Sequence, residues 1–143
     1  MADRRKSGSV DELLEIAKHR VTANRAKLGS DPALRKETVS TDIPDLDVIL
    51  GGGWRRGRMG LIVGNESMGK TLVTQWTIKA FQARDYTCGL IDPEKTFDAE
   101  WFAATGVDPS KLIVVVPTTA EEAFDLAVAW VQAGIGVVVI GGG

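Results

Sequence analysis

One segment of the sequence combines two glycines with a lysine and a hydroxyl residue at a fixed spacing. It matches the pattern GxxxxGK[ST] and reads Gly64-Asn65-Glu66-Ser67-Met68-Gly69-Lys70-Thr71. Glycines allow such a loop to turn tightly, so that its backbone N–H groups face phosphate oxygens. The lysine supplies a positive charge to the β- and γ-phosphates, and the threonine hydroxyl is a ligand for Mg²⁺. The pattern therefore predicts that all eight residues form a site for ATP and Mg²⁺.

The flanking segments fit this interpretation. Met59 to Val63 is a short apolar run that predicts a buried strand, and residues 70–84 carry apolar residues at helical spacing. A helix that begins at Lys70 would point the positive end of its dipole at the phosphates. The alternatives are a glycine-rich turn that arises by chance and a degenerate loop that no longer binds nucleotide.

Strand and helix patterns alternate through the rest of the chain. Near-continuous apolar runs predict strands, and amphipathic runs between them predict helices: strands at 87–91, 111–116 and 137–140, helices at 99–104 and 120–133. A shorter helix is predicted at 43–50, before the glycines at 51–53. Uninterrupted apolar strands are typical of a parallel sheet that is buried on both faces. We therefore expect an α/β fold with a mostly parallel sheet flanked by helices.

The first part of the chain has a different character. Residues 10–28 place apolar residues among charges at helical spacing, with Ser9 as a candidate N-cap and Gly29 as the stop. Residues 29–40 are polar and include Pro32, which is typical of a linker. We expect an N-terminal helical arm and linker at 1–39, which could serve oligomerisation, and a nucleotide-binding core at 40–143.

Composition narrows the class of protein. The 143 residues are 44% hydrophobic and 25% charged with a net charge of -2, which predicts one soluble globular unit. The charge gives no global attraction to nucleic acid, and no apolar stretch reaches the length of about 20 residues that spans a membrane. The single cysteine, Cys88, lies in an apolar run and is expected in the core. We expect a cytoplasmic location.

Several motifs together resemble the RecA family of bacterial and phage recombinases. They are the phosphate loop, the entry segment at 40–53, Gly57-Arg58, Ile91-Asp92-Pro93-Glu94, Asp98, Trp101 and the segments 106–108 and 117–123. The resemblance covers about residues 40 to 140. It implies a P-loop NTPase core that binds ATP and Mg²⁺, with DNA-dependent ATPase activity. It also implies filaments on single-stranded DNA, in homologous recombination and DNA repair, that self-associate through the N-terminal helix.

The resemblance also implies roles for residues outside the phosphate loop. Glu94 matches the catalytic glutamate that polarises the attacking water. The alternative is a solvated loop acid, with which Lys95 could pair. Asp98 matches the residue that accepts a hydrogen bond from the adenine amino group. Trp101 falls where an aromatic ring packs on adenine, with a core tryptophan as the alternative.

One motif of the family is incomplete. The apolar strand at 137–140 should end in an aspartate that supports Mg²⁺, and Gly141 stands at that position. The DNA-binding loops and the remaining strands would lie beyond Gly143, so we expect the sheet to be incomplete at its C-terminus. Either the chain is a piece of a longer recombinase, or it is a naturally short relative whose catalysis has decayed. In both cases nucleotide binding should survive better than turnover, because hydrolysis needs metal, water and phosphate to be positioned together.

Other functions are compatible with the same phosphate loop. A non-recombinase P-loop module with a regulatory or protein-interaction role would bind nucleotide without any effect of single-stranded DNA. A helicase-type motor fits the segment from Asp92 to Asp98 less well. The arginines at 55, 56 and 58 could contact DNA, but three arginines in a turn are more often a solvated edge.

Overall fold

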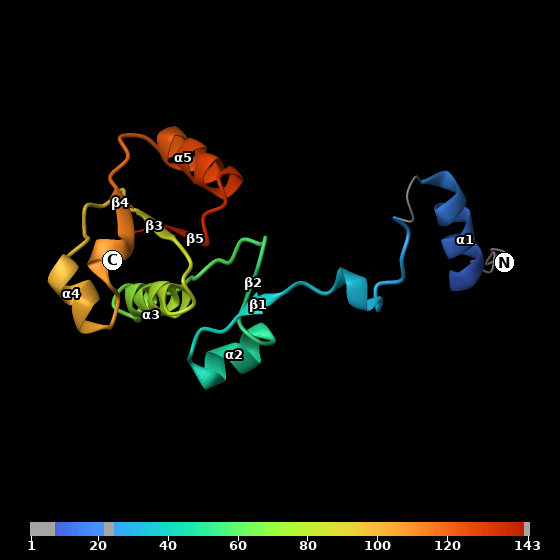
Figure 1. The fold of residues 1–143 in the computed structure, drawn as a ribbon, viewed down its shortest axis with the longest axis horizontal. Coiled ribbons are helices and arrows are strands. Elements are labelled where there is room, and N and C mark those ends of the chain that lie inside the picture. The colour runs from blue at the N-terminus through green and yellow to red at the C-terminus, as the bar shows by residue number, and fades with distance from the viewer. Residues whose placement is uncertain (1–7, 22–24, 142–143) are drawn as a thin grey trace, which may run out of the picture. The chain divides into compact units, whose positions relative to one another are not determined.

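The structure is a computed structural model of the chain, and it describes residues 8–21 and 25–141. By contacts the chain divides into two compact units, Met1–Lys36 and Glu37–Gly143 (Figure 1). We describe each unit by itself. Within the described ranges, no helix has the length and apolar character needed to cross a lipid bilayer.

The first unit contains helix α1 (Val10–Arg20) and a 3₁₀ turn, η1 (Pro32–Leu34). Ser9 begins α1, because its hydroxyl accepts a hydrogen bond from the N–H of Glu12 at 3.2 Å. The helix is shorter than predicted: Val21 is extended, residues 25–28 are not helical, and residues 22–24 lie outside the described ranges. No residue of α1 is buried. The helix therefore gains little from packing, and helices without a packed face are rarely long.

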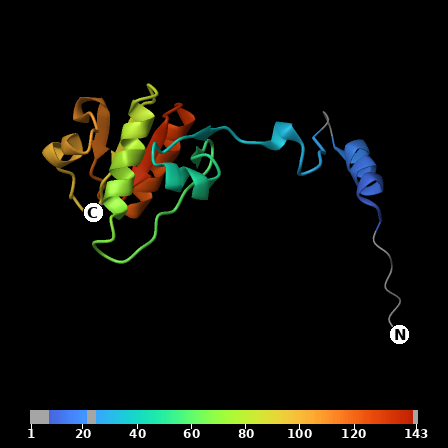
Figure 2. The ribbon, with the colours of Figure 1, turned by 90° about the horizontal axis from the view of Figure 1, so that it is seen from below.

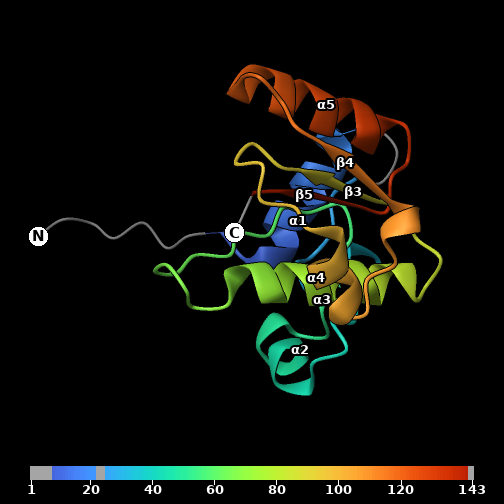
Figure 3. The same cartoon turned by 90° about the vertical axis from the view of Figure 1, so that its left-hand side faces the viewer.

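The second unit is built on a parallel sheet in the order β4 (Leu112–Val115), β3 (Cys88–Ile91) and β5 (Val137–Ile140). Cys88 lies opposite Leu112 on one side and Val137 on the other. Helices α3 (Lys70–Gln82) and α5 (Ala120–Gln132) cover opposite faces of this sheet (Figures 1 and 3). All four residues of the central strand are buried, which confirms the prediction of an α/β fold with a parallel sheet.

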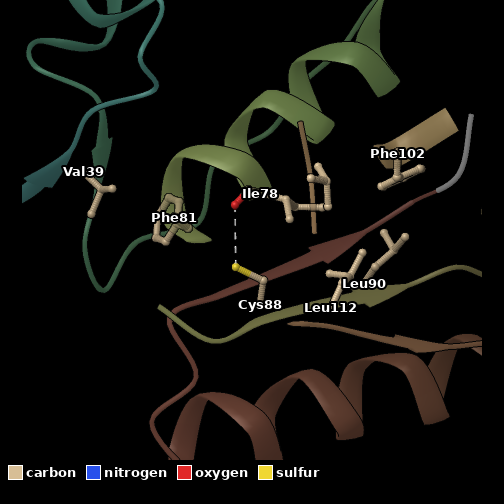
Figure 4. Packing of buried hydrophobic residues seen from close by; sticks show 8 residues of the cluster. Val39, Ile78, Phe81, Cys88, Leu90, Phe102 and Leu112 are labelled. Atoms are coloured by element: carbon tan, nitrogen blue, oxygen red, sulfur yellow. Dashed lines mark hydrogen bonds between the residues drawn. The ribbon is translucent and has the colours of Figure 1, made fainter. Parts of the chain in front are cut away.

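The main core lies between α3 and the sheet (Figure 4). Ile78 and Phe81 of α3 pack with Cys88 and Leu90 of β3, and Phe102 joins them from α4 (Ala99–Ala104). The thiol of Cys88 donates to the carbonyl of Ile78 at 3.8 Å. Cys88 is fully buried, so the prediction of a core cysteine is confirmed.

An antiparallel pair of short strands, β1 (Thr38–Val39) and β2 (Trp54–Arg55), flanks helix α2 (Pro44–Leu50). Polar contacts join the β1–β2 pair and the segment before α2 to α3. The indole N–H of Trp54 donates to the hydroxyl of Thr77 at 3.0 Å, and Arg84, just after α3, pairs with Asp42. The sequence predicts α2, but strands of two residues are too short to produce a periodic pattern.

The strand predicted at Met59–Val63 is not formed. This segment is part of the irregular loop that runs from β2 to the start of α3 (Figure 2). Its side chains are largely exposed: Met59 is 93% exposed, Leu61 85% and Val63 80%. An apolar run becomes a strand only when its backbone N–H and C=O groups find a partner strand. Among the described residues, β5 is an edge of the parallel sheet and the segment does not pair with it.

Candidate functional site

The predicted phosphate loop leads directly into α3. Gly69 is the N-cap of the helix and has a left-handed backbone with φ 83°, while Ser67 is also left-handed with φ 60°. No side chain caps the helix. Its first N–H groups are thus left without a side-chain acceptor, which is the arrangement that proteins use to bind anions.

The side chain of Lys70 folds back over this loop. Its ammonium group donates to the carbonyls of Gly64 at 3.0 Å and Asn65 at 2.7 Å. These two bonds join the end of the loop to its first two residues through the lysine side chain. Residues 64–69 are exposed, whereas Lys70 and Thr71 are half-buried in the first turn of α3.

A second group of predicted site residues follows β3. The connection from α3 to β3, residues 83–87, is short, and α3 packs along the sheet. The amino end of α3 must therefore lie at the carboxyl end of β3, where Asp92, Pro93 and Glu94 follow the strand. The carboxyl ends of parallel strands are where open α/β sheets bind their ligands.

Glu94 is exposed in the middle of the loop between β3 and α4. Within residues 8–21 and 25–141, its carboxylate makes no hydrogen bond and no ion pair, including none with Lys95. Lys95 has a left-handed backbone with φ 58°. The structure therefore shows no pair with Lys95, and the exposed carboxylate fits both a catalytic residue and a solvated loop acid.

Asp98 begins helix α4. Its Oδ1 atom accepts hydrogen bonds from the N–H groups of Glu100 at 2.9 Å and Trp101 at 3.1 Å. Its Oδ2 atom has no hydrogen-bond partner in the part of the chain that the structure describes. One oxygen of Asp98 thus caps the helix, and the other is left to accept a further donor.

The side chain of Trp101 lies on the outer face of α4. It is 45% exposed and meets the buried Phe102 ring edge-on, with 6.2 Å between ring centroids. The alternative of a core tryptophan is wrong for this residue. An exposed indole one turn after Asp98 is free to pack on a planar ring.

The structure brings together only some of the predicted residues. Lys70 contacts Gly64 and Asn65, and Asp98 caps the turn that holds Trp101. In the described ranges, no hydrogen bond or ion pair joins residues 64–71 to Glu94 or Asp98. The burial of Asp92 beside Glu94 was not predicted, although an acidic residue directly after a buried strand was the available signal.

A small hollow of about 220 Å³ lies beside this region, on the α5 side of the sheet. It is lined by Pro93, Pro117, Thr118, Phe124 and Ile140, among others, and by none of the predicted site residues. Its apolar lining carries no charged side chain. It therefore does not belong to the predicted phosphate site.

Of the three arginines at 55, 56 and 58, Arg56 makes structural contacts that explain its presence. The guanidinium group of Arg56 lies 4.9 Å from the centroid of the Tyr86 ring and donates to its hydroxyl at 3.1 Å. It also lies 3.8 Å from Glu37. Arg55 and Arg58 are exposed. Arg56 thus connects the β1–β2 pair to Tyr86, in the segment between α3 and β3.

Comparison with known proteins identifies relatives over nearly the whole chain. Residues 10–142 match the family described as the RecA N-terminal domain. The chain is 36% identical to "Protein RecA" of Synechococcus sp. (strain CC9902), an alignment that covers 97% of this chain and 39% of the relative. It is 35% identical to "Protein RecA" of Prochlorococcus marinus (strain MIT 9211), over 85% of this chain and 34% of that protein. The chain therefore spans well under half the length of these relatives.

Proposed function

This chain belongs to the RecA family, and from that premise we propose that it binds ATP with Mg²⁺ at the loop Gly64–Thr71 as the nucleotide-binding part of a DNA recombinase. The observation that carries the proposal is the form of the loop. It is left-handed at Ser67 and Gly69, is closed by Lys70, and leads into a helix whose N-terminus has no side-chain cap. Each of these features favours an anion.

The chemistry of the loop residues fits a nucleotide triphosphate. The Lys70 ammonium group would exchange its two loop carbonyls for phosphate oxygens, which are stronger acceptors because they carry charge. The Thr71 hydroxyl, in the first turn of α3, would be a ligand to Mg²⁺. No group of three His, Cys, Asp or Glu residues that could hold a metal occurs in the described ranges. Mg²⁺ would therefore depend on the phosphates for most of its ligands, as is usual for this ion.

The remaining residues would act on the other parts of the nucleotide. Glu94, exposed just after the carboxyl end of β3, would polarise the water that attacks the γ-phosphate. Asp98 would accept the adenine amino group at Oδ2, the oxygen that does not cap α4, and Trp101 would pack on the adenine ring.

The wider activity is part of the same proposal. We propose that the protein acts in homologous recombination and DNA repair in the cytoplasm, by forming ATP-dependent filaments on single-stranded DNA. Helix α1 would support self-association, because none of its residues is buried and it presents exposed Leu13 and Ile16. ATP turnover by this chain should be weak, since Gly141 replaces the expected aspartate after β5.

The test is a titration of a fluorescent ATP analogue with Mg²⁺ against the parent chain and Lys70→Ala. A charge-assisted hydrogen bond contributes about 1.5–3 kcal/mol, so Lys70→Ala should weaken binding by about tenfold or more. Lys79→Ala is the matched control, because Lys79 is an exposed lysine on the same helix. Equal binding by the parent and Lys70→Ala would refute the site.

A second arm of the same titration adds single-stranded DNA. A recombinase should bind the analogue more tightly when DNA is present, because the two ligands favour the same assembled state. Nucleotide binding that DNA does not change would instead favour a P-loop module with another role.

A further inference from the structure

A buried carboxylate stands directly after the central strand. Asp92 is 1% exposed, and it is the one charged side chain among the buried residues of the described ranges. A buried charge is costly unless hydrogen bonds replace the water that it loses. The partners of Asp92 therefore show what its burial stabilises.

Both oxygens of Asp92 bind the far end of the loop that follows it. Oδ2 accepts the backbone N–H of Phe97 at 2.8 Å, and Oδ1 lies 3.4 Å from the hydroxyl of Thr96. The backbone N–H of Asp92 itself donates to the carbonyl of Val115 on β4 at 2.8 Å. The carboxylate thus joins residues 96 and 97 to the end of the sheet and closes a short loop.

Both ends of this loop are anchored, and between them the backbone N–H of Lys95 donates to the carbonyl of Asp92 at 3.4 Å. At the far end, the ring of Phe97 packs edge-on against the buried Phe102, with 4.8 Å between centroids. In between, Pro93 has a restricted φ and Lys95 has a left-handed one of 58°. Glu94 lies between these two residues, and its side chain has no partner in the described ranges. Only the backbone course of the loop therefore determines where its carboxylate points.

We propose that Asp92 is a positioning residue, whose buried carboxylate holds the Pro93–Phe97 loop and so fixes the location of Glu94. The effect of Asp92 on turnover rests on the proposed function, in which Glu94 polarises water. The effect of Asp92 on the structure of the loop is independent of that function. A carboxylate suits this task because it offers an acceptor oxygen to each of two donors, whereas an amide offers only one.

The structural effect is tested with a spin label at Glu94→Cys, measured in the parent background and with Asp92→Ala or Asp92→Asn. The native thiol does not compete for the label, because Cys88 is fully buried. In Asp92→Ala we expect the label to move several-fold faster. In Asp92→Asn we expect intermediate mobility, because one acceptor oxygen remains.

A control label at Ala129→Cys, an exposed position on α5, should not change in any background. If mobility at position 94 is the same in Asp92→Ala as in the parent, the proposal is wrong. If both labels loosen together, Asp92 serves general stability and the proposal is also wrong. Should Asp92→Ala fail to fold, Asp92→Asn decides: mobility equal to that of the parent would overturn the proposal.

A kinetic measurement then separates this proposal from the function on which it rests. If ATP turns over, Asp92→Ala should lower kcat by roughly 10- to 100-fold with little change in nucleotide affinity, as expected for a displaced group. Combined with Glu94→Gln it should lower kcat no further. Additive losses would overturn the positioning role. A parent chain that binds no ATP analogue would refute the proposed function, while the label result would stand.

Discussion

Gln75, in the middle of α3, has a side chain with no polar partner. It is 0% exposed, and neither Nε2 nor Oε1 has a hydrogen-bond partner among the described residues. Most buried amides are hydrogen-bonded, because desolvation without a partner is unfavourable. We therefore predict that Gln75→Met makes the protein more stable. Methionine is also unbranched, has a similar side-chain volume and has a similar helix propensity.

The size of the effect follows from the two unpaired groups. An unsatisfied buried polar group costs about 1–3 kcal/mol, and a hydrophobic side chain of similar volume that fits imperfectly costs up to about 1.5 kcal/mol. The net gain expected for Gln75→Met is about 1–2 kcal/mol in the free energy of unfolding. For a chain of this size, each kcal/mol raises Tm by roughly 2–4 °C.

The assay is urea unfolding followed by far-UV circular dichroism, with the midpoint and the slope compared between variants. Gln132→Met is the matched control, because Gln132 is exposed in the last turn of α5 and its replacement should change stability by less than about 0.5 kcal/mol. A Gln75→Met variant that is less stable than this control would refute the reasoning. It would mean that the amide has a buried partner, such as a water molecule or a further segment of chain.

Three other predictions rest on single contacts. Gly89→Ala should destabilise the protein by about 1–3 kcal/mol in urea unfolding, because its Cβ would lie 2.6 Å from the indole of Trp130. The pKa of Asp42 is lowered, mainly by its hydrogen bond with Arg84. Arg84→Met should therefore lower the free energy of unfolding by less than about 1 kcal/mol at neutral pH. This loss of stability should vanish as the pH falls below 3.8 through the lowered pKa, because Asp42 is then protonated. Burial raises the pKa of the Cys88 thiol to about 11, so a thiol reagent at neutral pH should react with it only after unfolding, and fast reaction of the folded protein would contradict its burial.

Much of the sheet could be predicted because its signals are local. The strands β3, β4 and β5 are runs of four or more apolar residues, each followed by a polar or glycine-containing turn. The helices between them carry clear caps, such as Asp98 for α4 and Thr119 for α5. These features depend on neighbouring residues alone, so periodicity identifies them.

The errors arose where structure depends on distant partners. Met59–Val63 has the composition of a strand, but composition does not supply the paired backbone groups that a strand needs. The helix predicted to Leu28 ends at Arg20 because α1 buries no side chain that would extend it. The β1–β2 pair depends on Gly53, where any Cβ would lie 2.1 Å from the carbonyl of Val39. The pattern of the sequence does not reveal such an approach.

In the candidate site, too, local features could be predicted from the sequence and features that depend on distant residues could not. The loop 64–71 is contiguous, so its residues could be predicted as a set from their spacing. The role that we propose for Asp92 could not be predicted in this way. Its evidence is the burial of the side chain and two hydrogen bonds that close the loop after β3.

Asp98 shows that a local explanation for a residue does not exclude a ligand for it. A helix cap accounts fully for an aspartate at this position, and taken alone it would remove the need for any functional reason. Both capping bonds, however, end on Oδ1, so that Oδ2 keeps its capacity to accept a donor. The cap also fixes the carboxylate relative to the exposed Trp101 one turn later. The cap on α4 therefore leaves one oxygen of Asp98 beside the indole, as the proposed contact with an adenine ring would need.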